Sequence, residues 1–179
     1  MANTNVFTGA HGTLTLAPLD TAEGRDAGSV IEAYDIQQAV GRVVDVKVCV
    51  KTDLEEFHEI GRRYATSLHP GNIHVSGTVG RAYINGALLG LLLGRKSFIP
   101  STAEPFVQPA FNLTLRLDDP ATIGNAELVV NGVQFQNWSL SLPEDDFVME
   151  EVSFKALSVD IIDIEGEVTI GPIFVEEGG

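Results

Sequence analysis

The sequence predicts a mainly β protein, an antiparallel β-sandwich or barrel with one short flanking α-helix. Three observations lead to this prediction. Much of the chain alternates between apolar and polar residues, turn-forming residues separate the alternating segments, and one apolar run repeats at helical spacing. With 179 residues, the chain has the length of a single domain (residues 1–179) and can bury a sizeable core.

Alternation marks the expected strands, which cover residues 13–16, 34–40, 43–51, 73–79 and 111–117. Residues 20–30 contain glycines and charges, so we expect an exposed loop there. Asn131 and Gly132, between two apolar runs, indicate a hairpin turn. The apolar residues change phase between Gln136 and Trp138, which predicts a β-bulge.

The most apolar run predicts the helix, at about residues 82–93. Gly86, Gly90 and Gly94 are spaced four apart, as in closely packed membrane helices. The run is too short for a span, however, because a membrane helix needs about 20 consecutive apolar residues. We therefore expect a helix packed on the core, with Gly94 at its C-terminal cap.

Two of the expected strands, residues 43–51 and 73–79, can pair and present one dry and one polar face. The valines of the first strand lie on the dry face. The polar face carries Asp45, Lys47, Cys49, Lys51, His74, Ser76 and Thr78. It is polar without being strongly charged, so it could line water.

The connection between these strands, about residues 52–72, is predicted to be a long loop. Long ordered loops are uncommon in compact domains and are usually functional. Phe57, Tyr64 and Leu68 make this one unusually apolar. It either packs on its own core or docks on another subunit.

Acidic residues give the chain a net charge of −14. Residues 140–179 contain eleven acidic residues and a single lysine. This balance argues against binding nucleic acid, because lysine and arginine supply most of the affinity for phosphate. The acidity serves either solubility or the repulsion of a polyanion.

The residue types offer little for catalysis or metal binding. No second histidine follows His58 at the spacing of a zinc helix, and neither Asp118-Asp119 nor Asp145-Asp146 comes with the rest of a glycosidase or calcium site. We therefore expect neither an enzyme nor a cofactor. Cys49, alone in an alternating strand, is expected to be a structural thiol, and with no sign of a secretory signal this fits a reducing cytoplasm.

Several weak motifs together resemble the tail tube proteins of tailed bacteriophages. They are FTGAHGTLTLAPL, IHVSGTVGRAYINGALLGLLLG and ELVVNGVQFQNWSLSLPEDDFVMEEVSFKALSV. The second is the closest: a polar alternating strand, an arginine, an aromatic residue, then a short apolar helix ending in glycine. The resemblance extends from about Val6 to Val159 and includes neither the insertion LDTAEGRDAGSVIEA nor the acidic end.

The resemblance implies a structural virion protein. Six copies would close into a ring whose inner strands form a β-barrel, and the rings would stack into a hollow tube for genome ejection. It would be assembled in the cytoplasm of the host bacterium and be located in the virion tail. Its partners would be other copies of itself, the sheath and baseplate or terminator components, and double-stranded DNA that passes without specific binding, with no membrane involved.

On the same resemblance, the polar face would line the lumen through Asp45, Lys47, His74, Ser76 and Thr78. The long loop would reach the neighbouring ring and bury Phe57, Tyr64 or Leu68 there. The positive charges of Lys47 and Lys51 would attract phosphate, which conflicts with a lumen surface that repels DNA. Either nearby carboxylates such as Asp45 neutralise them, or the inner face is assigned wrongly at that end.

Two alternatives stay open. One is the inner tube protein of a secretion or contractile injection system, which shares the architecture and lacks a DNA cargo. The other is a monomeric β-sandwich binding module, for which the scattered aromatic residues offer no clustered binding groove.

Overall fold

The computed structural model describes residues 9–36, 40–94, 108–118, 125–163 and 168–170. A short 3₁₀ turn (Gly9–His11) precedes the first strand. The helices are α1 (Ala22–Tyr34) and α2 (Ala87–Leu93). The strands are β1 (Gly12–Pro18), β2 (Val43–Phe57), β3 (Ser67–Ala82), β4 (Phe111–Asp118), β5 (Asn125–Ser141), β6 (Met149–Ala156), β7 (Ser158–Asp163) and β8 (Val168–Ile170). All strand pairs are antiparallel, so the predicted mainly β, antiparallel fold is confirmed.

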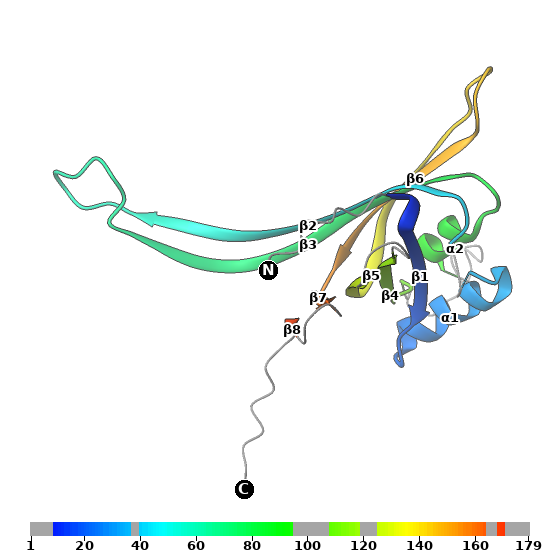
Figure 1. Ribbon diagram of the computed structural model, residues 1–179, viewed down its shortest axis with the longest axis horizontal. Helices are drawn as coiled ribbons and strands as arrows, with labels where there is room; N and C mark the ends of the chain where they lie inside the picture. The colour runs from blue at the N-terminus through cyan, green and yellow to red at the C-terminus, as the bar shows by residue number, and fades with distance from the viewer. Residues whose placement is uncertain (1–8, 37–39, 95–107, 119–124, 164–167, 171–179) are drawn as a thin grey trace, which may run out of the picture.

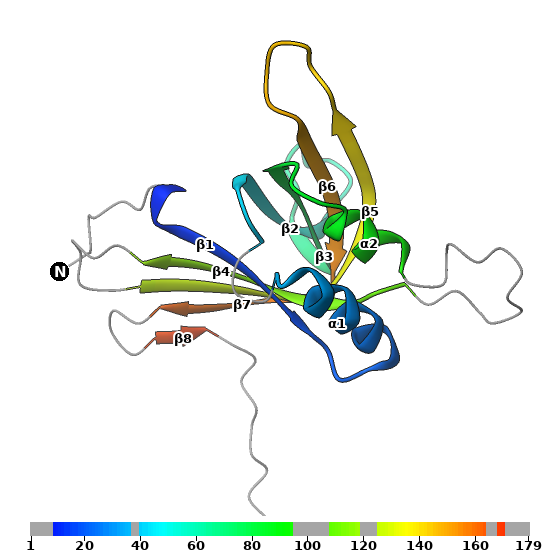
Figure 2. The ribbon, with the colours of Figure 1, turned by 90° about the vertical axis from the view of Figure 1, so that its right-hand side faces the viewer.

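The strands follow the order β1-β4-β5-β6-β3-β2, with β7 also beside β5 and β8 beside β7. The first half of β5 pairs with β4 and β7, whereas its second half pairs with β6. Strand β5 therefore belongs to two sheets that cross at a steep angle in Figure 2. Among the strands that the structure describes, neither sheet closes into a barrel.

Two bulges shape β5 where it changes sheets. The predicted hairpin turn at Asn131-Gly132 is wrong, because the strand runs straight through it. Gly132 has φ 65°, and the β4 pairing shifts register at this point, so the left-handed glycine forms a bulge instead of a turn. The predicted bulge near Gln136 is confirmed: Phe135 and Asn137 pair with successive residues of β6.

The core lies where the crossing sheets meet the two helices. Phe111 and Phe135 stack edge to face at its centre, with ring centroids 5.0 Å apart. This geometry suits the charge distribution of aromatic rings. Other fully buried members include Ala27, Ile31, Leu88, Leu91, Leu113, Val130, Val133 and Val152.

Helix α1 corrects two predictions, the exposed loop at residues 20–30 and the strand at residues 34–40. The Thr21 hydroxyl oxygen accepts a hydrogen bond from the Gly24 amide at 3.1 Å and caps the helix. Ala27 and Ile31, four residues apart, face the core. Tyr34 ends the helix, and residues 37–39 lie outside the described residues.

The helix predicted at residues 82–93 is confirmed in its apolar part as α2, whereas Ala82 belongs to β3. Gly94 caps its C-terminus, as expected. Gly90 allows α2 to approach α1, since a Cβ there would lie 3.3 Å from a methyl group of Val30.

The excursion predicted at residues 52–72 is present, but only residues 58–66 of it are a loop. The rest continues the ladder between β2 and β3 as far as Phe57 opposite Ser67. Pro70 and Gly71 accompany a register shift within this ladder. Figure 1 shows the resulting arm, defined as residues 52–72, projecting far from the rest of the molecule.

Candidate assembly surface

Four strands form one continuous polar face: β2, β3, β6 and the second half of β5. The register places Lys47 opposite Thr78, Cys49 opposite Ser76, Lys51 opposite His74 and Asp45 opposite Gly80. Because side chains alternate along a strand, these residues share a face. The structure thus brings together the residues predicted to line a lumen, namely Asp45, Lys47, His74, Ser76 and Thr78.

Strand β6 adds three residues that the sequence did not indicate for this face. Ser153 and Lys155 pair opposite Thr78 and Ser76, and Glu151 pairs opposite Gly80. Their spacing of two is visible in the sequence, but their neighbours are known only once the pairing of β6 with β3 is known.

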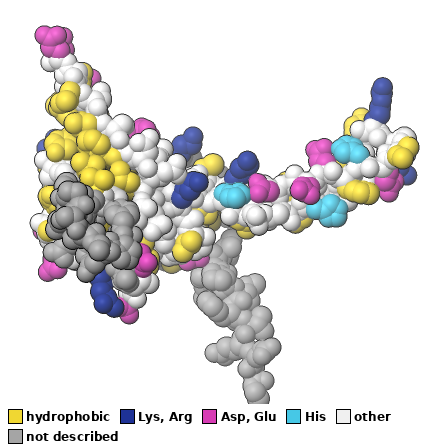
Figure 3. Space-filling view, turned by 180° about the vertical axis from the view of Figure 1, so that it is seen from behind, with side chains coloured by type: hydrophobic (Ala, Val, Ile, Leu, Met, Phe, Trp, Pro, Cys, Tyr) yellow, Lys and Arg dark blue, Asp and Glu magenta, His cyan; other side chains and the backbone are white. Residues whose placement is uncertain are grey.

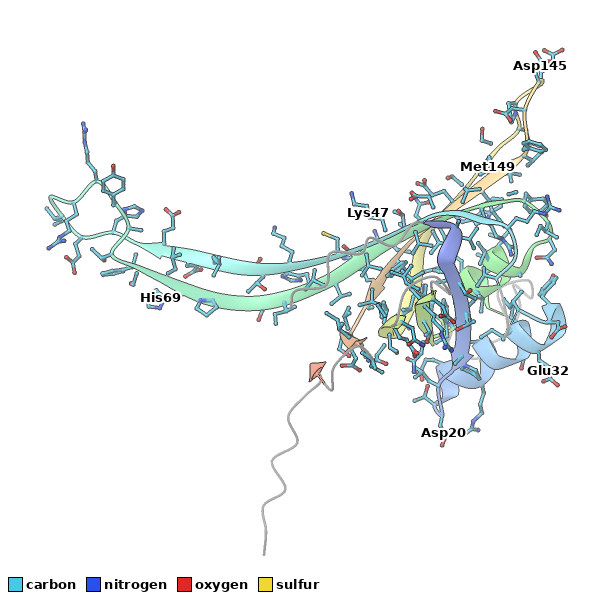
Figure 4. The ribbon with its side chains drawn as sticks, in the orientation of Figure 1. Asp20, Glu32, Lys47, His69, Asp145 and Met149 are labelled. Carbon is cyan, nitrogen blue, oxygen red and sulfur yellow. The ribbon has the colours of Figure 1, made fainter. Side chains whose placement is uncertain are left out.

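Opposite charges on the polar face nearly balance. The lysines are Lys47, Lys51 and Lys155, and the carboxylates are Asp45, Asp53, Glu55 and Glu151. In Figure 4, Lys47 lies on the hairpin of β2 and β3, close to where the hairpin leaves the rest of the molecule. The expected conflict from Lys47 and Lys51 is therefore offset by carboxylates on the same face.

One ion pair on this face lies at the start of the arm. The His74 Nε2–H donates a hydrogen bond to Asp53 Oδ2 at 2.9 Å. This hydrogen bond, together with the charges of His74 and Lys51, holds the pKa of the Asp53 carboxyl below its ordinary value.

The predicted inter-ring residues are all exposed, with accessible fractions of 54% for Phe57, 87% for Tyr64 and 57% for Leu68. They do not form one cluster. Phe57 pairs opposite Ser67 and Leu68 opposite Glu56, so Phe57 and Leu68 point to opposite faces of the ribbon. Tyr64 lies in the loop at the tip.

The face opposite the polar one is mostly apolar. Near the core, Val75 and Val79 are buried. Farther out, Val50 and Ile73 on this face are more than half exposed, and so is Leu54 beyond the bulge at Asp53. The arm therefore carries apolar surface that no residue described by the structure covers.

A buried ion pair anchors the base of the hairpin. The Arg81 guanidinium pairs with the Glu150 carboxylate and donates to the carbonyls of Val40 at 2.7 Å and Asn85 at 3.1 Å. The Trp138 indole N–H donates to the other Glu150 oxygen at 2.9 Å. Buried charges are tolerated when paired and hydrogen-bonded in this way, so the network fixes β3 against β6.

Within the described residues, no group of three or more His, Cys, Asp or Glu side chains could hold a metal ion. No helix in the part of the chain that the structure describes is long and apolar enough to cross a membrane.

Comparison with known proteins identifies the fold. No protein-family model and no curated protein sequence matches the chain. Among solved structures, it is similar to the PVC sheath/tube terminator of an extracellular contractile injection system in the extended state, at 11% identity and TM-score 0.60. This match covers 90% of this chain and 99% of that one.

A chain of the PVC sheath–tube complex matches at 12% identity and TM-score 0.59 over 90% of this chain and 94% of that one. A chain of the SPP1 tail tube matches at 10% identity and TM-score 0.52 over 88% of this chain and 78% of that one. The fold of this chain is therefore the one found in tail tubes and in tube complexes of contractile injection systems.

Proposed function

We propose that this chain is a structural subunit of a phage tail tube, in which copies form hexameric rings that stack into a hollow conduit for the genome. The observation that carries the proposal is a polar, charge-balanced sheet face bounded by two unpaired edges. The likeness of the fold to tube and terminator proteins supports it.

The two edges lie on opposite sides of the same four strands. Strand β2 has a strand partner only on its β3 side, and β5 beyond Val133 has one only on its β6 side, within the described residues. Unpaired edges are prone to pair with other chains. In β2 this edge runs along the strand from Val43 to Phe57, so it offers a partner strand a long row of backbone donors and acceptors.

Pairing of these edges between copies would close a ring. Strand β2 runs antiparallel to β5 within one chain, because three antiparallel steps separate them. Rotation about an axis along the strands preserves their direction, so β2 of one copy meets β5 of the next in antiparallel orientation. A head-to-tail contact of this kind forms a closed ring when the rotation closes.

The polar face would then line the lumen. Its carboxylates slightly outnumber its lysines, which leaves no net attraction for phosphate, because DNA affinity depends on an excess of basic residues. Double-stranded DNA would pass without specific binding. Sheath, baseplate or terminator proteins would contact the outside and the ends of a tube located in the virion tail and assembled in the cytoplasm of the host bacterium.

A second candidate is the inner tube of a contractile injection system, favoured by the likeness to the sheath–tube complex. Both roles use the same ring. The nucleic-acid content of particles isolated from the producing cells separates them, because only the phage tail delivers DNA.

Negative-stain electron microscopy with light scattering on the purified protein tests the proposal. Rings or hollow tubes are expected. A monomer at every concentration, with no rings or tubes, would contradict a tube role.

The single cysteine tests which face lines the lumen. Cys49 is exposed in the isolated chain. In tubes we expect a bulky polyethylene-glycol maleimide to be excluded from it, whereas a small maleimide still reacts. The matched control moves the thiol to an exposed site on α1, in the variant Cys49→Ser/Glu32→Cys, which should react with both reagents. Equal labelling of Cys49 by both reagents in intact tubes would place the polar face outside.

A further inference from the structure

The arm and the β5–β6 turn lie at opposite ends of the hairpin sheet. Strand β2 leads to the arm loop, residues 58–66, whereas β5, which is antiparallel to β2, leads to the turn at residues 142–148. Figure 1 shows these two turns pointing away from each other. When subunits stack along the strand direction, the loop of one ring therefore faces the turn of the next.

The arm loop is apolar and basic. Ile60 and Tyr64 are the most exposed large apolar residues of the described chain. Arg62 forms an ion pair with Glu59 at 3.6 Å inside the loop. Arg63 forms no ion pair with any residue that the structure describes, which leaves one uncompensated positive charge at the tip.

The β5–β6 turn is apolar and acidic. Leu142 and Phe147 are 74% and 78% exposed. Between them lie Glu144, Asp145 and Asp146, and no cation occurs in residues 142–148. Asp146 Oδ1 accepts a hydrogen bond from the Phe147 amide at 2.7 Å, which orders the turn without neutralising it. Seen from behind, acidic side chains lie at the tip of the turn, whereas basic side chains stand out at the tip of the arm with acidic ones beside them (Figure 3).

We infer that the arm loop of one subunit docks on the β5–β6 turn of a second copy in the adjacent ring, with Arg63 against Glu144 and Asp145 and with Tyr64 against Leu142 and Phe147. The inference rests on the proposed tube and assigns its stacking contact to named residues. The two surfaces differ, so the contact is head-to-tail and repeats along the axis. Opposite charges would set its orientation and register, and apolar burial would supply most of its energy.

Charge reversal tests the contact. In Arg63→Glu, the loop would face carboxylates with a like charge. We expect rings to form while the critical concentration of rings for tube growth rises about tenfold or more, which corresponds to about 1.4 kcal/mol for each ring added. Combining it with Asp145→Arg restores the opposite pairing and should restore tube growth. The matched control is Arg25→Glu, an equal charge change at an exposed position of α1, which should polymerise normally.

A cysteine pair provides a second readout. In a Cys49→Ser background, Tyr64→Cys with Phe147→Cys should give a ladder of covalent oligomers on oxidation, and neither cysteine alone should give more than dimers. Normal tubes from Arg63→Glu, or no ladder from the cysteine pair in tubes, would overturn the stacking assignment and leave the tube role intact. Failure of the unmodified chain to form any ring or tube would overturn both.

Discussion

The body and the arm of this molecule achieve order in different ways. The body, meaning the crossing sheets with α1 and α2, encloses a core in which Phe111, Leu113 and Phe135 are fully buried. The arm is a two-stranded ribbon whose apolar residues, among them Leu54 and Leu68, are more than half exposed. Isolated two-stranded ribbons are marginally stable in water at best. The body thus stabilises itself, whereas the arm needs another chain.

Truncating one apolar side chain in each region tests this difference directly. Phe111→Ala should lower the free energy of unfolding of the dilute subunit by about 3–5 kcal/mol, because it leaves a cavity in the core. Leu54→Ala should change it by less than about 0.5 kcal/mol, as for exposed sites. Urea unfolding measures both. Similar losses for the two variants would show that the arm has a core of its own.

Glycines with positive φ extend the comparison. In Gly132→Ala, the new methyl group would lie 2.6 Å from Leu157 Cδ1 at the bulge, so we expect a loss of about 1–3 kcal/mol from strain and crowding. Gly61 in the arm loop has φ 85°, but the space around an added Cβ is open. Gly61→Ala should therefore lower the free energy of unfolding by less than Gly132→Ala does. Thermal unfolding of both variants checks the order.

Both regions contain features that local sequence patterns predict correctly. The phase change at Gln136 is a local signal, and it located a real bulge. The hairpin strands at residues 43–51 and 73–79 alternate cleanly, so their polar face could be assigned before their register was known. Both are properties of a few neighbouring residues.

What sequence reasoning missed depends on contacts between distant segments. The sequence predicted that Gly24 lies in a loop. The structure places it inside α1, where glycine is required because a Cβ would lie 1.8 Å from the Leu19 carbonyl oxygen. Arg81 precedes the apolar run in the sequence, and its burial depends on Glu150 and Val40, far away in the chain. Within the polar face, the residues of β6 were missed for the same reason.

The arm's apolar surface should matter for assembly and not for folding. Leu68→Asp should leave the far-ultraviolet circular dichroism and the melting temperature of the subunit unchanged while abolishing tubes, since a charge would enter a buried contact. Phe57→Asp and Tyr64→Asp are expected to behave alike. Asn72→Asp, which adds the same charge at an exposed polar site of the arm, is the control. Tubes from all of these variants would remove the arm from the interface.

The charge balance of the polar face predicts a change in cargo behaviour. Asp45→Asn combined with Glu151→Gln leaves the lysines in excess, so tubes should retain added double-stranded DNA at low salt and release it as the salt concentration rises. Co-sedimentation measures the bound DNA. The control is Glu23→Gln with Glu32→Gln on α1, which removes two charges from the helix side. Equal retention by both variants would contradict a lumenal polar face.

The smallest expected effect concerns pH. Because the folded-state pKa of Asp53 is lowered, its ion pair with His74 contributes above the ordinary carboxyl pKa and is lost as the pH falls through the lowered value, below about pH 4. His74→Gln should raise the pKa of Asp53 toward its ordinary value with little change in stability at neutral pH. A carboxyl NMR titration measures the shift, and an unchanged pKa would contradict the pairing.

Amide hydrogen exchange compares the two regions most directly, in dilute subunits and in assembled tubes. Core amides of β4 and β5 should exchange slowly in both states. Amides at residues 52–72 should exchange quickly in the dilute subunit and slowly in the tube, because a two-stranded ribbon opens easily until a second chain covers it. Equal protection of the arm in both states would contradict the claim that its apolar surface is built for another copy.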